Sequence, residues 1–271
     1  MGLIRKLFKK KEVSSRQEPE LHSNHVIMGF VLLKTPEIEE GKLTEAIKST
    51  FGDLISLEIS REKLFSVIVH REDLSFICTL MPFAVPDQEV ESQVPYNSLT
   101  PEGEKALTGH QAFLVVAGKD IDIRRKRESC LFFNRLCGVF MRMEEAAGMY
   151  MGGAGLLIEK EIYLKHVEII ESPVSENQEY FPAPLWIRVL LYMDQERKMA
   201  RTSGLTDFGH PDVCIYNTHQ EPEILYQQLY LMAMEEITGK SIYRSGDQIW
   251  TSDGTEAVCK LNDGVLYIIG T

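Results

Sequence analysis

The sequence contains few cysteines, and none of them is placed for a disulfide framework or a zinc site. No CxxC pair occurs, and the total is odd. A disulfide framework needs an even set, and thiolate zinc sites need closely paired cysteines. Most of these residues lie in apolar runs, so we expect buried thiols that behave as small hydrophobic side chains. The five residues are Cys78, Cys130, Cys137, Cys214 and Cys259.

Long apolar runs are also missing. No stretch reaches the roughly eighteen apolar residues of a membrane span. The N-terminal segment MGLIRKLFKKKEVSS has too short an apolar stretch, and no small-residue cleavage site, for a secretory signal. We therefore expect a cytoplasmic protein. A hydrophobic content of 44% in 271 residues is enough to build a core.

Positive charge is concentrated at the N-terminus. The net charge is −11, yet residues 1–11 carry five basic residues and no acid. Such an acidic body repels phosphate backbones, so we expect no nucleic-acid partner. Residues 1–23 are interpreted as a basic flexible tail, with weak contact to an anionic membrane surface as the alternative. The cations of that alternative are Arg5, Lys6, Lys9, Lys10 and Lys11.

Complete catalytic motifs are absent as well. There is no GxSxG nucleophile elbow and no HExxH zinc helix, and the seven histidines show no metal-ligand spacing. The DFG triplet at Asp207–Gly209 lacks the other kinase motifs. The glycines of residues 148–155 follow a predicted helix, whereas phosphate loops precede one. The sequence thus predicts no metal, no cofactor and no identifiable catalytic residue.

What is present is a pattern of short strands and helices that predicts an α+β fold. We expect two mixed β and α halves with largely antiparallel sheets. The first half, residues 24–170, opens with a buried strand and a helix that starts at Pro36 after a Thr35 N-cap. Strands follow up to residue 80, then a loop over residues 82–109. A further strand leads into a long helix that ends before the glycine-rich stretch.

A proline-containing linker, residues 171–184, leads to a C-terminal module over residues 185–271. Its pattern predicts three strands, a helix with Pro222 in its first turn and Gly239 as its end, and a final meander. The tripeptide Pro-Glu-Ile opens a predicted helix in both halves. We therefore consider a pseudo-repeat possible.

Several polar residues lie near predicted strand ends and are candidates for binding a ligand or partner. His110 opens a buried strand, and Tyr150 stands among glycines. The segment Thr202–Thr218 combines turn-forming Gly204 and Gly209 with residues that can carry charge or a proton. The candidates are His110, Tyr150, Arg201, Asp207 and His210.

Three stretches of the second half together resemble a bacterial family known as domain of unknown function 4261. They are RTSGLTDFGHPDVCIYNT, LYQQLYLMAMEEITG and GDQIW. HQAFLVVA and AGMYMGGAG are similar to the family's first half. The resemblance covers most of residues 25–271 and is most specific from Leu185 onward. It implies these fold boundaries and no activity, cofactor or catalytic residue.

These observations favour a non-catalytic cytoplasmic protein that recognises another protein through an acidic face. An immunity-type or stress-associated role is one form of this hypothesis. The alternative is an enzyme with a pocket between the two halves, lined by the five candidate residues, with residues 82–109 as a lid.

Overall fold

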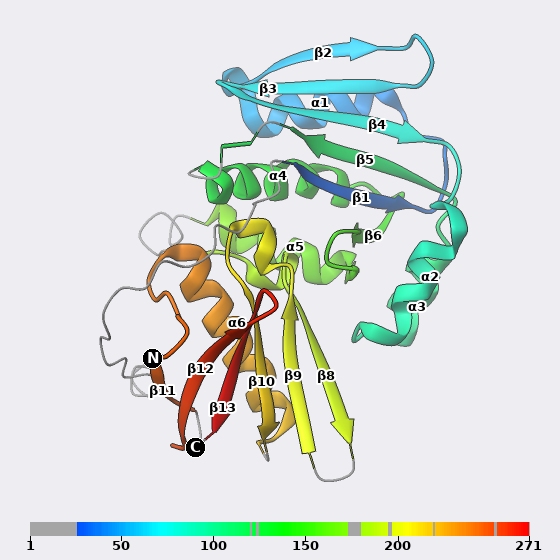
Figure 1. Cartoon of the computed structure of the whole chain (residues 1–271). Helices are drawn as coiled ribbons and strands as arrows, with labels where there is room; N and C mark the ends of the chain where they lie inside the picture. Colours follow the sequence, from blue (N-terminus) through cyan, green and yellow to red (C-terminus); the bar gives the residue numbers. More distant parts are fainter. Residues whose placement is uncertain are drawn as a thin grey trace. The chain divides into compact units, whose positions relative to one another are not determined.

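The computed structural model describes residues 26–119, 121–122, 125–172, 180–194, 197–218, 220–251 and 254–270. The chain divides into two compact units between Leu185 and Trp186, and Figure 1 shows their elements. We call residues 25–185 the N-terminal unit and residues 186–271 the C-terminal unit. The expected basic tail lies outside the described residues, as do residues 173–179 of the expected linker.

A seven-stranded antiparallel sheet in the order β2-β3-β4-β5-β1-β6-β7 forms the centre of the N-terminal unit. The apolar run of β1 lies inside the sheet, between β5 and β6, because it can be buried on both faces. The strands are β1 (Ile27–Leu33), β2 (Ser56–Ser60), β3 (Ser66–Arg71), β4 (Leu74–Met81), β5 (Ala112–Gly118), β6 (Ala146–Met151) and β7 (Leu156–Glu159).

Three longer helices pack on one face of this sheet. They are α1 (Glu40–Phe51), α4 (Lys126–Met141) and α5 (Lys160–Glu171). α4 contacts β1 and β6, and both α1 and α5 pack against α4. Two short helices, α2 (Glu89–Gln93) and α3 (Pro101–Thr108), contact β6 and β7 near one end of the sheet (Figure 1).

The prediction that the first helix starts at Pro36 is wrong, because α1 starts at Glu40. The Thr35 hydroxyl accepts a hydrogen bond from the Glu37 amide at 3.2 Å, which closes a local turn in place of a helix cap. Glu39, with an extended backbone, is the residue that precedes the helix.

The prediction of a loop over residues 82–109 is also wrong. The segment folds into α2, α3 and the 3-10 turns Pro86–Gln88 and Val94–Tyr96. Thr100 caps α3, since its hydroxyl accepts the Gly103 amide at 3.0 Å. Glu159 accepts the Thr100 amide and hydroxyl, both at 2.8 Å, and so ties the start of α3 to the end of β7.

The prediction that a helix runs up to the glycine-rich stretch is wrong. α4 stops at Met141, and Gly148 lies within β6. A Cβ atom at Gly148 would stand 2.6 Å from the Ile158 carbonyl oxygen and 2.5 Å from Leu107 Cδ2. Glycine is therefore required here because β7 and α3 approach too closely for a side chain.

The C-terminal unit contains a six-stranded sheet in the order β11-β12-β13-β10-β9-β8. Its pairings are antiparallel except for β10 with β13. The strands are β8 (Arg188–Asp194), β9 (Arg197–Ser203), β10 (Asp212–Thr218), β11 (Gln248–Trp250), β12 (Glu256–Asn262) and β13 (Val265–Gly270). Helix α6 (Pro222–Thr238) packs against β8, β9 and β10.

The prediction of an α+β fold with largely antiparallel sheets is confirmed. The pseudo-repeat stays a prediction. Pro222 is the first residue of α6, whereas α1 starts four residues after Pro36, so the shared tripeptide does not occupy equivalent positions in the two helices.

A pH-dependent contact joins α5 to the segment that follows residue 179. His166 Nδ1 lies 2.6 Å from the Tyr180 hydroxyl. Burial lowers the pKa of His166 and raises the pKa of Tyr180 to about 12. In the unfolded chain His166 takes up a proton below about pH 6.5. In the folded chain its pKa is lower, so protonation there requires a lower pH. The free energy of unfolding should therefore fall as the pH drops below about 6.5.

Urea unfolding of the wild type and of His166→Gln near pH 5.5 and pH 7.5 measures this contribution. We expect the wild type to lose more stability than the variant between the two pH values, because only the wild type carries the titrating ring. An equal loss in both proteins would show that His166 does not contribute to the pH dependence of stability.

Candidate functional site

His110 is held inside the N-terminal unit by both ring nitrogens. It lies between α3 and β5 and is 5% exposed. Nε2 accepts the Val85 amide at 2.9 Å, so the proton resides on Nδ1, which donates to the Leu107 carbonyl at 2.7 Å. With both nitrogens engaged, the ring links two segments of backbone and has no free nitrogen for a ligand.

Tyr150 is a second interior support of the same unit. Its ring is 1% exposed and packs in a cluster with Leu32, Leu107 and Phe113. Its hydroxyl donates to Glu89 Oε1 at 2.7 Å, which joins β6 to α2. His110 contacts the backbone of Val85 and Leu107, members of this cluster, so the two candidates support one region of the core.

The segment Thr202–Thr218 in the C-terminal unit is organised by Thr202 and Asp212. The Thr202 hydroxyl donates to Asp212 Oδ1 at 3.0 Å and accepts the Val213 amide at 2.8 Å. Asp212 Oδ1 also accepts the Leu205 amide at 3.2 Å. Burial raises the pKa of Asp212, while these hydrogen bonds oppose the rise. The segment is therefore a fixed connection between β9 and β10, with Gly204 and Gly209 at positive φ.

His210 lies on this connection and pairs with Glu236 of α6. Its Nδ1 stands 2.8 Å from Glu236 Oε2, and the Glu236 side chain is only 1% exposed. Glu236 Oε1 accepts the Tyr243 amide at 2.7 Å. Among the described residues, Oε2 makes no hydrogen bond, and His210 is the one basic side chain at ion-pair distance from it. The pair thus joins the turn, the helix and the segment after the helix.

A histidine oriented by a carboxylate is also the arrangement of a general base. The His210 side chain is 22% exposed, so its other nitrogen could meet solvent or a substrate. A nucleophilic mechanism would need a serine, threonine or cysteine at that nitrogen. Within the described part of the chain, no such side chain hydrogen bonds to His210.

Sequence reasoning missed Glu236, although the sequence contains a signal for it. The buried face of α6 includes Leu225, Leu229, Met232 and Ala233. Glu236 continues this spacing by one more turn, so an acid occupies an apolar position of the helix. A buried carboxylate needs a charged or hydrogen-bonding partner, which predicts a residue such as His210 opposite it.

The other two candidates, Asp207 and Arg201, lie close to this pair in sequence but have separate surroundings. Asp207 is in the 3-10 turn Leu205–Phe208, where its amide donates to the Gly204 carbonyl. Arg201 lies on β9 opposite Cys214 of β10. The side chain of Arg201 therefore shares a face with Cys214, and the neighbouring Thr202 points to the other face.

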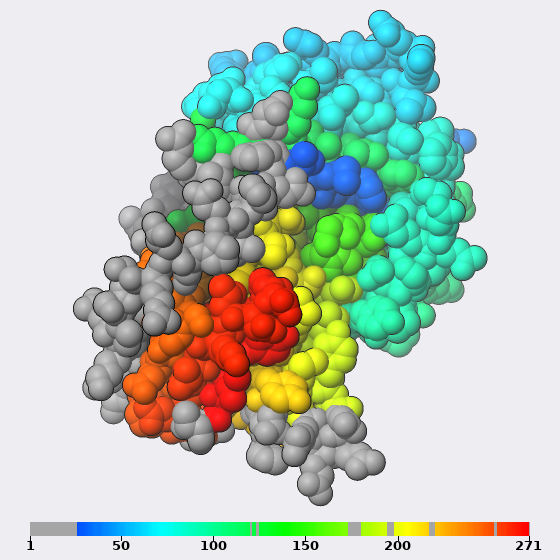
Figure 2. Space-filling model, in the orientation of Figure 1, coloured from blue at the N-terminus to red at the C-terminus, as the bar shows by residue number. Residues whose placement is uncertain are grey.

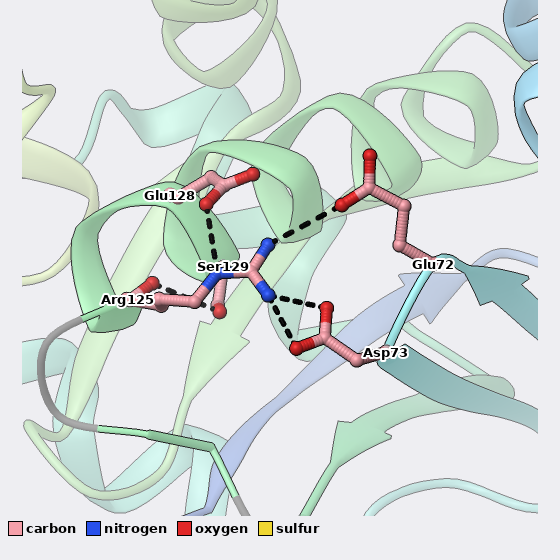
Figure 3. Close-up of polar contacts among 5 residues, drawn as sticks. All are labelled: Glu72, Asp73, Arg125, Glu128 and Ser129. Atoms are coloured by element: carbon pink, nitrogen blue, oxygen red, sulfur yellow. Dashed lines mark hydrogen bonds and ion pairs between the residues drawn. The ribbon is translucent and has the colours of Figure 1, made fainter.

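Arg125, in the basic run at residues 124–127, is not free to bind an anion. Arg125 contacts three acids, as Figure 3 shows. Its Nε donates to Glu128 at 3.1 Å, its Nη1 bonds both Asp73 oxygens, and its Nη2 lies 3.6 Å from Glu72. This contact lowers the pKa of Asp73. Arg125 thus fastens the start of α4 to the turn between β3 and β4.

One face of the C-terminal sheet is buried by α6. Ala200, Ile215 and Ile268 are paired across β9, β10 and β13 and are all at most 2% exposed. Paired residues point to the same side of a sheet, and their chain neighbours point to the other. The neighbours of these residues therefore define a second face, which α6 leaves open.

The second face carries an apolar side chain on each of the six strands, although Gln248 stands opposite Val258 and Glu256 opposite Trp250. Tyr216 pairs with Ile269, and Ile269 pairs with Val258. Tyr216, Trp250 and Ile269 are 48%, 45% and 40% exposed. Figure 2 shows atoms of the C-terminal strands, in red and orange, at the surface. We call this set the open-face stripe; it consists of Tyr192, Met199, Tyr216, Trp250, Val258 and Ile269.

A small cavity adjoins the β8 end of the stripe. Its volume is about 320 Å³, near the lower limit for small-molecule sites. Lys198 lines it but is engaged, since its Nζ bonds the Gln220 carbonyl at 3.1 Å and lies 3.7 Å from Glu221. The lining residues are Leu191, Tyr192, Met193, Lys198, Pro222 and Leu225. The walls are mainly apolar, so the cavity suits an apolar side chain better than a charged ligand.

In the described part of the chain, no group of three or more histidines, cysteines or acids is placed to hold a metal ion. Among the helices of the described residues, none has both the length and the apolar character of a membrane span.

Models of known protein families, curated proteins and solved structures were compared with the chain, and none of the three comparisons finds a match.

Proposed function

We propose that the protein is a non-catalytic binding protein that recognises another protein through the open-face stripe. The observation that carries the proposal is a set of exposed apolar side chains, with Tyr216, Trp250 and Ile269 at 48%, 45% and 40%, on the sheet face that α6 does not cover. Exposed aromatic residues are enriched at protein interfaces, where a few of them supply most of the binding energy. Large contiguous apolar patches are rare on the surface of a monomeric protein, and they often mark interaction sites.

The chemistry of this face favours a protein over a small molecule or a nucleic acid. The stripe is spread over a sheet face, whereas small molecules are held in concave sites. Aromatic rows can also stack nucleic-acid bases, but such sites lie in basic grooves. This chain carries a net charge of −11, and Arg125 of its basic run is occupied by three acids. A partner with an apolar surface fits best.

We propose that the protein binds its partner in a bacterial cytoplasm, in an immunity-type or stress-associated role. All five cysteines are free and buried, although the chain has thiols enough for two disulfides. Burial raises the pKa of Cys214 to about 11, which keeps this thiol protonated and unreactive. Free thiols are typical of reducing compartments, which supports this location.

Affinity capture with matched variants tests the proposal. Tyr216→Glu places a charge in the stripe, and Ile59→Glu does the same on β2 of the N-terminal unit, at a residue of similar exposure (45%). A central aromatic contributes about 2 kcal/mol to binding, so we expect Tyr216→Glu to retain roughly thirtyfold less of the captured partner than the wild type.

The control variant Ile59→Glu should capture as much partner as the wild type. The proposal fails if Tyr216→Glu captures the same proteins in the same amounts. It also fails if the wild type captures no protein in stoichiometric amount at low and moderate salt.

Catalysis at His210 is the second candidate function. It is favoured by the buried carboxylate that orients the ring, and by the exposure of the side chain. The same pair also has a structural purpose, since it joins three segments of the C-terminal unit. The enzyme hypothesis therefore requires turnover that depends on the second ring nitrogen, and not only a stable His210–Glu236 pair.

A further inference from the structure

β8 is an edge strand of the C-terminal sheet and lacks the usual protection of an edge. Among the described strands it pairs with β9 alone. Its sequence is RVLLYMD, so the five inner residues carry neither charge nor proline. Leu191, Tyr192 and Met193 are 41%, 47% and 74% exposed. Edge strands with this composition pair with further strands unless charge, proline or short length prevents it.

The other described edges have such protection. β2, at one edge of the N-terminal sheet, has Glu58 at its centre. β7 and β11 have only four and three residues. β8 is thus the one described edge that combines length, apolar character and exposure, so it can accept a further strand.

We propose that β8 of a second copy of this chain covers this edge, antiparallel and centred on Leu191. An antiparallel arrangement continues the pattern of the sheet, in which β8 pairs antiparallel with β9. It is also the arrangement in which two copies of one strand face each other about a twofold axis.

The same register matches the inner residues of the two strands. Val189 meets Met193 of the other copy, Leu190 meets Tyr192, and Leu191 meets its own counterpart on the twofold axis. Each cross-strand pair is apolar, and such pairs stabilise a sheet. The surface is therefore complementary to itself, as a twofold interface requires.

The pairing would join two six-stranded sheets into one and lengthen the open face. Tyr192, the end of the stripe, would lie beside Leu190 of the other copy. The stripe of one copy would then continue into that of the next. The dimer does not depend on the stripe's partner, because β8 pairs through its backbone edge and Tyr216 lies on β10.

The molecular mass in solution gives the first test. Sedimentation equilibrium of the wild type over a range of concentrations should show a species of twice the chain mass. Leu191→Lys should restore the single-chain mass, because two ammonium groups would meet on the twofold axis. The control Ile59→Lys adds the same charge to the edge strand β2 and should remain dimeric.

Cross-linking gives the second test, which does not depend on the stability of Leu191→Lys. Leu191→Cys should form a disulfide between copies on mild oxidation, since opposite residues of antiparallel strands lie at disulfide distance. Tyr192→Cys should form far less, because it faces residue 190. The native thiols are all buried and do not compete.

A wild type with the single-chain mass at all concentrations overturns the proposal. A dimer that persists in Leu191→Lys also overturns it, as does equal cross-linking at residues 191 and 192. Partner capture by the stripe is unaffected by these outcomes. Conversely, if Tyr216→Glu still captures its proteins while the cross-link forms at residue 191, the proposed function fails and the dimer stands.

Discussion

Replacing His210 with leucine is expected to lower the free energy of unfolding of the C-terminal unit by about 3 kcal/mol. The cost arises because Glu236, which is 1% exposed, would keep a buried carboxylate oxygen without the one basic side chain described at ion-pair distance from it. Because His210 is partly exposed, we expect a loss of stability at the lower end of the range for removing one partner of a buried ion pair. Urea unfolding, with hydrogen exchange of the α6 amides as the local probe, measures it.

His210→Asn is the matched variant, because its amide nitrogen can take the position of Nδ1 beside the Glu236 carboxylate. We expect it to lose only about 1 kcal/mol. If both variants lose the same stability, the His210–Glu236 pair is not the cause. The asparagine variant also separates the two candidate functions, since it removes the second ring nitrogen. Loss of an observed turnover in a folded His210→Asn protein would support catalysis.

Replacing Tyr150 with alanine should destabilise the N-terminal unit by about 4 kcal/mol. The ring is 1% exposed and lies 5.8 Å from that of Phe30, between β6 and the two short helices. Removing it leaves a cavity in this cluster and frees Glu89 of α2. Hydrogen exchange of the β1 and β6 amides should show the loss.

Tyr150→Phe separates the ring from its hydroxyl. Glu89 is exposed and can return to water, so the loss of this hydrogen bond should cost only about 1 kcal/mol. An alanine variant as stable as the phenylalanine variant would contradict the interior role of the ring. Such a result would revive Tyr150 as a residue available to a ligand.

The parts of the fold that the sequence predicted are those with strong local signals. Helix α6 runs from Pro222 to Thr238 and is followed by Gly239 with a φ of 69°, as its proline, apolar spacing and glycine indicated. The strands of the C-terminal meander followed from their turns in the same way. In these elements, neighbours in sequence determine the conformation.

The parts that the sequence failed to predict depend on distant contacts. α3 is capped by Thr100, and this cap is held by Glu159, 59 residues away. Gly148 looked like the end of a helix, yet it is a strand residue that permits close approach of α3 and β7. Neither feature shows a hydrophobic periodicity or a turn residue in the sequence. Local propensity therefore predicted a loop in place of α3 and a helix end in place of the strand at Gly148.

The site residues follow the same division. His210 was recognised as a proton carrier on a turn, but its partner Glu236 lies on a helix 26 residues later. The open-face stripe could not be derived, because it needs the register of six strands. Its residues are single outward positions of separate strands, and only the pairing of Tyr216 with Ile269 and of Ile269 with Val258 aligns them.

Partner recognition by the open-face stripe is tested most directly by site-specific photo-cross-linking in cells. A photoreactive phenylalanine analogue replaces Tyr216 in one protein and Ile59, of similar exposure, in another. We expect a specific adduct with a second protein from position 216 and none from position 59. The same adducts from both positions, or none from position 216, would contradict the proposed binding function.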